Sequence, residues 1–236
     1  MANPALNEKL LNKIGSTTSD RAMTIDGTIN KTGILLLCAI VGAAVGWGSS
    51  SSLVLFGSMI ATLILSVLII FGPQRAAYLS QPYAFLEGVL LGAISSMYAA
   101  LYAGIVSKAL FLTLGCLAVM LALYRFRIIR VTEQVRSMIL AATMAIALTY
   151  LVTMVLSLFH VDVPMLHEGS LMGIGFSVVV VAVAAFNLLL DFDLIEQAQQ
   201  QGAPKYMEWY GGFALLVTLV WLYLEILRLM SKLNKK

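Results

Sequence analysis

The stretch LMGIGFSVVVVAVAAFNLLL, residues 171–190, decides the fold class of this chain. It contains no charged side chain, and its 20 residues match the length of a membrane-spanning helix. At 1.5 Å per residue, about 20 mostly apolar residues cover the hydrocarbon core of a bilayer, which is roughly 30 Å thick. The stretch therefore predicts a transmembrane helix, and the search for others proceeds outward from it.

Six further apolar runs have a similar length: residues 33–47, 53–71, 83–103, 106–124, 138–159 and 209–230. All five prolines lie outside the seven runs, as expected for helices that must satisfy their backbone groups internally. We therefore predict an all-α integral membrane protein with a seven-helix bundle. Its domain would comprise residues 32–231, after a polar amino-terminal segment 1–31 and before a basic tail 232–236.

The composition excludes most other classes. Of 236 residues, 60% are hydrophobic and only 11% are charged, with a mean hydropathy of +0.92. A soluble domain is about a quarter charged, and a disordered chain is far less apolar. The net charge of +3 is spread over several loops, which argues against a nucleic-acid partner. We expect no cofactor and no metal centre, since Cys38 and Cys116 lie singly inside apolar runs.

The distribution of Lys and Arg predicts the orientation. With the amino terminus in the cytoplasm, ten of the 15 basic residues lie on the cytoplasmic side and five on the other, in agreement with the positive-inside rule. The basic carboxyl end does not fit, because seven crossings put it outside. Six crossings with a re-entrant last segment would put it inside, so this alternative stays open.

Acidic residues inside or near the spans are the candidate functional groups, because a charge in the bilayer is costly. Glu87 lies one turn into the third span, beside a small-residue face formed by Gly88 and Gly92. It is either an interfacial carboxylate next to a packing groove or a group that lines a cavity. Asn187 and Asp191 end the sixth span four residues apart, on one helix face. Asp191 is thus expected to face the bundle.

Two acids of the last span compete as partners of Asp191. Glu208 begins this helix and lies at the depth expected for Asp191, so depth favours Glu208. Glu225 lies about 25 Å further along the axis, but it is the acid deepest inside the span, so burial favours Glu225. Glu225 also has Arg228 in position for an i, i+3 ion pair. Asp193 and Glu196 are expected to face water.

Several stretches resemble the Bax inhibitor family, especially its bacterial YccA-like branch. They are NLLLDFDLIEQ (187–197), GAPKYMEWY (202–210), LYLEILRLM (222–230), MTIDGTINKTGILLL (23–37) and AFLEGVLLG (84–92). The resemblance implies a seven-helix fold whose last helix is surrounded by the other six, in a bacterial inner membrane. Some members of the family leak calcium in a pH-dependent way, and others restrain membrane proteases or cell-death pathways.

In the calcium-leak members, two aspartates and a basic residue close the pore. Asp191 matches the first aspartate, and Arg75 in GPQRAAY (72–78) lies where the basic residue is expected. At the second aspartate this chain departs from the family, because counting back from the shared Leu-Arg of the last span leads to Thr218. Two coupled carboxylates can sense pH near neutrality, and this coupling needs a second acid.

Two functions follow as hypotheses. The first is a pH-sensitive leak for calcium or other cations, with Asp191 at the cytoplasmic mouth and Arg75 closing it by pairing. The second is a non-conducting regulator that binds a membrane protease or a stress-response protein. We predict no catalysis, because the spans carry no histidine for a serine-type intramembrane protease and no motif of an aspartyl one.

Overall fold

The computed structural model describes residues 22–48, 52–159 and 171–234, which are almost entirely helical. Seven helices are long and apolar enough to cross a membrane, and they confirm the predicted fold class. They are α2 (Ile25–Trp47), α3 (Ser52–Ile70), α4 (Ala76–Leu101), α5 (Ile105–Arg125), α6 (Glu133–Leu158), α8 (Leu171–Gln200) and α9 (Met207–Asn234), with a short 3-10 helix η1 (Pro73–Arg75) before α4.

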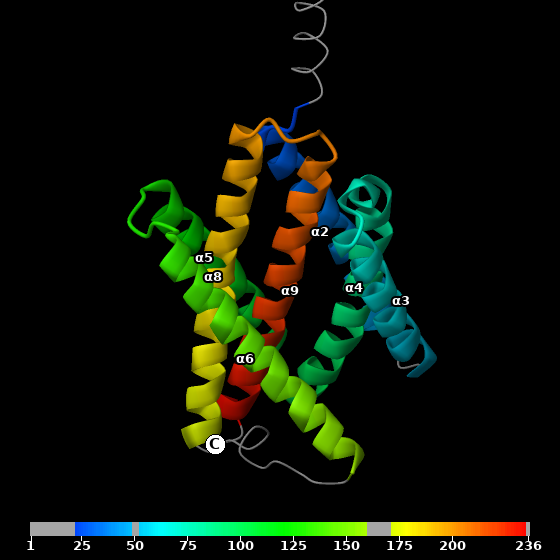
Figure 1. Cartoon of the computed structure of the whole chain (residues 1–236). Coiled ribbons are helices and arrows are strands. Elements are labelled where there is room, and N and C mark those ends of the chain that lie inside the picture. The colour runs from blue at the N-terminus through cyan, green and yellow to red at the C-terminus, as the bar shows by residue number, and fades with distance from the viewer. Residues whose placement is uncertain (1–21, 49–51, 160–170, 235–236) are drawn as a thin grey trace, which may run out of the picture.

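The last helix, α9, forms the centre of the bundle (Figure 1). It packs against α2, α4, α5 and α8, while α3 packs mainly on α4 and α6 mainly on α8. Four helices rather than six therefore surround it closely. Its 28 residues form one uninterrupted helix about 42 Å long. This continuous helix does not agree with the alternative of a re-entrant last segment.

Glycines bring α2 and α4 into close contact. A Cβ atom added at Gly88 or Gly92 would overlap the backbone of Ala39 or Ala43, and one at Gly42 would overlap the Phe85 carbonyl oxygen of α4. The small-residue face predicted in the third span therefore receives α2. Such faces let membrane helices approach until their backbones touch.

Several helices are longer than the apolar runs predicted. α4 begins at Ala76 and contains Pro82, which membrane helices tolerate because neighbouring groups satisfy the freed carbonyl. α2 begins at Ile25, inside the segment predicted to be a polar arm. Lys232, predicted to start a tail, lies within α9 and is buried, and its Nζ donates to the Ser177 hydroxyl at 2.8 Å.

Residues 22–24, which belong to the segment 1–31 predicted to be polar, pack on the bundle. Met23 is buried, and its N–H donates to the Ala203 carbonyl at 2.8 Å. Thr24 caps α2 by accepting a hydrogen bond from the Gly27 N–H. Residues 1–21 of the predicted arm lie outside the described residues.

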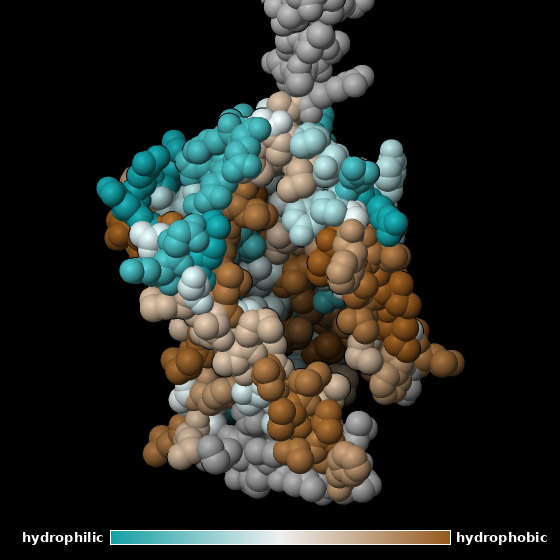
Figure 2. Space-filling view, in the orientation of Figure 1, coloured by the Kyte–Doolittle hydropathy of each residue, from teal (hydrophilic) through white to brown (hydrophobic). Residues whose placement is uncertain are grey.

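The surface separates into two zones (Figure 2). Hydrophilic residues gather at the end that carries the α5–α6 loop and the α8–α9 connection, and hydrophobic residues cover the remaining length of the helices on the face shown. Many large apolar side chains, such as Leu63 and Phe111, are exposed. The chain is therefore a multi-pass membrane protein whose apolar surface faces lipid.

The glycine contact makes a prediction about stability. Gly88→Val should force α2 and α4 apart and lower the thermal midpoint by several degrees, because overpacking costs about 1–3 kcal/mol. The control is Gly115→Val on α5, where an added Cβ meets nothing within 4 Å. Thermal unfolding of both purified variants in detergent checks this. Equal midpoints would show that the close approach does not stabilise the bundle.

Candidate functional site

Asp191 of α8 and Thr218 of α9 meet inside the bundle. The Thr218 hydroxyl is a hydrogen-bonding neighbour of the Asp191 carboxyl group, and Thr218 itself is buried. The Oδ2 atom of Asp191 is also buried, and it has no hydrogen-bond partner in the described part of the chain. Thr218, the residue reached by counting back along the last span, therefore lies beside Asp191.

The site lies well below the polar end of the molecule. Asp191 is nine residues before the end of α8, and Thr218 is eleven residues after the start of α9, so both are about 14–17 Å along their helices. Because α8 and α9 are antiparallel neighbours, the two positions fall at one depth. The Asp191 carboxyl group therefore lies below the polar end of the bundle, level with Thr218.

Arg75 and Glu87 do not join this site. Arg75 is exposed, at the end of η1, and the ion pairs found among the described residues do not include one between Arg75 and Asp191. Glu87 is buried in α4 next to the Thr62 hydroxyl of α3. Glu87 therefore belongs to the α3–α4 contact. It is more buried than expected for a carboxylate at the membrane interface beside a packing groove.

Glu208 serves the start of α2 instead. Its Oε1 accepts hydrogen bonds from the N–H and the hydroxyl of Thr24, both at 3.1 Å. Its carboxylate lies so close to Gly27 that a Cβ atom there would overlap it. An acid at a helix amino terminus is favoured by the helix dipole. Glu208 thus has a structural role, and its described hydrogen bonds lead away from Asp191.

Glu225 forms the local ion pair that its sequence spacing suggested. Arg228 lies 3.3 Å from its Oε1, and the Tyr150 hydroxyl of α6 donates to both carboxylate oxygens at 3.0 Å. The Arg228 guanidinium also stacks over the Tyr150 ring. This cluster lies two turns beyond Thr218 along α9, about 10 Å away. Glu225 is therefore fully engaged at another depth.

Asn187 and Asp193 connect α8 to α6. The Asn187 side chain donates to the Thr143 hydroxyl at 2.8 Å, so it binds α6 rather than Asp191. Asp193 was expected to face water, but its Oδ2 accepts from Arg136 at 2.6 Å in an ion pair that is largely shielded. Glu196, also expected to face water, accepts a short hydrogen bond from the Tyr124 hydroxyl of α5.

Of the six predicted site residues, then, only Asp191 lies at the meeting point of α8 with the central helix. Glu87, Asn187, Glu208 and Glu225 each bind a partner on a different helix. No group of three or more metal-binding side chains was found among the described residues. The arrangement can take up a proton or transiently bind a cation at Asp191. One short loop of the sequence also contains two histidines and two acids, and these lie outside the described residues: His160, Asp162, His167 and Glu168.

The ion pair between Arg136 and Asp193 can be tested by a double-mutant cycle. With side chains 33% and 14% exposed, Arg136→Gln and Asp193→Asn should show a coupling free energy of about 1 kcal/mol. The control pair is Arg136 with Glu133, which is 3.8 Å away and 86% exposed on the acid side, and should show almost none. Thermal unfolding of the four variants in each cycle measures this. Equal couplings would contradict the assigned pairing.

A comparison with protein families matches the chain over residues 3–235 to a family described as Bax inhibitor 1 like. The matched region includes all seven helices and the Asp191–Thr218 site. No curated protein matches the chain significantly.

Proposed function

The chain belongs to the Bax inhibitor 1 like family, and on this premise we propose that it is a pH-sensitive cation leak in which Asp191 controls passage. Calcium is the cation that the family resemblance favours, and hard cations prefer oxygen ligands. The proposed localisation is a bacterial inner membrane with the amino terminus in the cytoplasm.

The observation that supports the proposal is the unpartnered oxygen of Asp191. A buried polar atom without a hydrogen bond costs about 1–3 kcal/mol, and more when it is charged. Other acids of α8 and α9, such as Glu208 and Glu225, have donors. Asp191 Oδ2 has none in the described part of the chain. A proton or a cation that reaches this oxygen would supply the missing interaction.

Thr218 takes the place of a second gating carboxylate in this proposal. A hydroxyl can donate to a carboxylate and accept from a carboxylic acid, so the Asp191–Thr218 contact persists in both protonation states. One carboxylate and one hydroxyl supply far fewer oxygens than the six to eight that Ca²⁺ takes at a resident site. Weak binding of this kind suits passage, which requires that an ion also leave. Arg75 would act only in a conformation that brings it to Asp191.

The proposal makes a prediction about flux in liposomes reconstituted with the purified protein. Asp191→Asn imitates the protonated acid, so calcium flux should no longer change between about pH 6 and pH 8, whereas wild-type flux should. The control is Asp26→Asn, an exposed acid in the first turn of α2, which should behave as wild type. Asp193→Asn is unsuitable as a control because it breaks an ion pair.

Two outcomes would overturn the proposal. The first is a wild-type protein that passes no cation at any pH, and the second is an Asp191→Asn variant with an unchanged pH response. In the first case the regulator hypothesis, with a membrane protease or a stress-response protein as partner, would replace the leak.

The proposed orientation can be tested by cysteine labelling. Ser137→Cys, near the start of α6, and Ser107→Cys, near the start of α5, are exposed positions at opposite ends of the bundle. In intact cells a membrane-impermeant maleimide should label position 107 and leave position 137 unlabelled. The reverse pattern would invert the topology, and labelling of both would contradict seven crossings.

A further inference from the structure

A crevice separates α2 from α5. Both helices pack on α9, but in the described part of the chain they have almost no direct contact with each other. The α2–α5 crevice has Ile29 and Leu36 on one wall, Leu117 and Leu121 on the other, and Leu219 of α9 as its floor. Ile29 is 62% exposed and Leu121 49% exposed, so the crevice opens sideways toward lipid.

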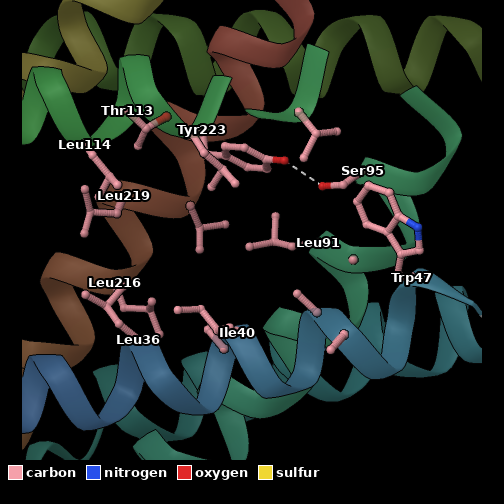
Figure 3. Close-up of a pocket in the computed structure, with 17 residues that line it drawn as sticks. Leu36, Ile40, Trp47, Leu91, Ser95, Thr113, Leu114, Leu216, Leu219 and Tyr223 are labelled. Atoms are coloured by element: carbon pink, nitrogen blue, oxygen red, sulfur yellow. Dashed lines mark hydrogen bonds between the residues drawn. The ribbon is translucent and has the colours of Figure 1, made fainter. Parts of the chain in front are cut away.

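The inner end of the crevice is an apolar cavity of about 360 Å³ (Figure 3). Leu36 and Leu219 line both this cavity and the outer part, so the two parts adjoin. The Ser95 and Tyr223 hydroxyls in its lining bond to each other at 2.7 Å, and the Thr113 hydroxyl donates to the Ala109 carbonyl at 2.8 Å. Apart from the Trp47 indole, which is 46% exposed, the polar side chains of the lining thus have partners. Its lining suits a hydrocarbon chain.

The wall formed by α5 continues from this cavity to the polar end. Leu110, Leu114, Leu117, Leu121 and Arg125 line the crevice at spacings of three or four residues, which places them on one helix face. The stripe is apolar for about three turns and then ends in a guanidinium group. The same helix face therefore changes from hydrocarbon-like to cationic at the membrane surface.

The outer part of the crevice, between these apolar walls and the polar end, has a volume of about 840 Å³. Three arginines line its mouth: Arg125, Arg127 and Arg130. All three are exposed, and the ion pairs found among the described residues involve only Arg136 and Arg228. Arg127 has a left-handed backbone with φ 54°, which residues other than glycine seldom adopt. The turn after α5 thus places three guanidinium groups around the mouth of the crevice.

The acids at this mouth do not cancel the positive charge. Asp193 lines the crevice but is paired with Arg136 at 2.6 Å. Glu196 also lines it, and it accepts hydrogen bonds from the Tyr124 hydroxyl and from Gln200 at 3.3 Å. With Asp193 neutralised, three arginines face one carboxylate. The mouth is therefore cationic overall.

We propose that the α2–α5 crevice binds an anionic phospholipid, with its phosphate at Arg125, Arg127 and Arg130 and an acyl chain along the α5 stripe. Basic pockets between transmembrane helices are known to favour anionic headgroups, and guanidinium groups bind phosphate in two-point contacts. A soluble anion would leave the apolar part unused.

The length of the crevice agrees with one lipid of a single leaflet. From Arg125 to Leu114 is eleven residues of helix, or about 16 Å, and half of the hydrocarbon core is about 15 Å. A chain whose headgroup contacts the arginines would thus end near Leu114 and Ile40, at the entrance of the apolar cavity. This site is independent of cation flux and of the gate at Asp191.

The first test is lipid retention by the full chain in detergent, measured by native mass spectrometry with equimolar phosphatidylglycerol and phosphatidylcholine. Wild type should retain phosphatidylglycerol preferentially. The triple variant with Arg125, Arg127 and Arg130 changed to Gln should lose this preference at least about tenfold, since each basic residue contributes about fivefold. Lys205→Gln, an exposed basic residue at the same end but outside the crevice, should keep it.

The triple Arg→Lys variant keeps the charge and should recover part of the preference. If the triple Gln variant does not fold, the single variant Arg130→Gln and a second test decide whether the arginines bind the lipid. That test uses phosphatidylglycerol with a diazirine at the end of one acyl chain, which should label wild type within α2 or α5 near Ile40 and Leu114. Absence of preference in wild type, unchanged preference in the variants, or labelling mainly on α3 and α6 would overturn the proposal. So would a stable dimer held through Leu121, shown by cysteine cross-linking.

Discussion

The bundle depends on the hydrogen bonding of α9, because lipid offers no partner to a polar group in the membrane. The buried side chains of this helix include the polar ones of Glu208, Thr218, Tyr223, Glu225 and Lys232. Each interacts with another segment, and the partners are Thr24 before α2, Asp191 on α8, Ser95 on α4, Tyr150 on α6 and Ser177 on α8. A helix so equipped is stable in a bilayer only when other helices surround it. The central position of α9 is therefore a consequence of its own polar residues.

The sequence was sufficient to predict the fold class but not the limits of the helices. An apolar run of 20 residues can satisfy its backbone only as a helix in lipid, so seven runs predict seven helices. The limits depend on tertiary contacts. α2 begins at Ile25 because Glu208, 184 positions from Thr24, binds the cap. α9 extends through Lys232 because α8 supplies the acceptors for its ammonium group. A hydropathy analysis ends a span at a charged residue such as Lys232, because it takes no account of partners on other helices.

The candidate site was predictable only in part, for the same reason. Asp191 stands out by its position in the sixth span and by the family motif, and Thr218 could be found by counting along the last one. The geometry that separates Asp191 from Glu208 and Glu225 is set by how α8 and α9 lie side by side, which no local pattern encodes. The pairing of Asp193 with Arg136 joins residues 57 apart across α6 and α8. Asp193 and Glu196 were predicted to face water because their partners, Arg136 and Tyr124, are distant in the sequence.

These contacts also explain why Asp191 differs from the other acids. Glu208 and Glu225 each join α9 to another segment, and replacing them would remove the acceptors of the Thr24 and Tyr150 donors. Asp191 has the Thr218 hydroxyl as a hydrogen-bonding neighbour, and its Oδ2 atom has no partner in the described chain. A charge on Asp191 therefore adds little to helix packing, although a charge inside an apolar bundle is costly. Thr218 is followed directly by Leu219, which is the floor of the α2–α5 crevice. One turn of α9 thus touches both the acid inside the bundle and the crevice that faces the lipid.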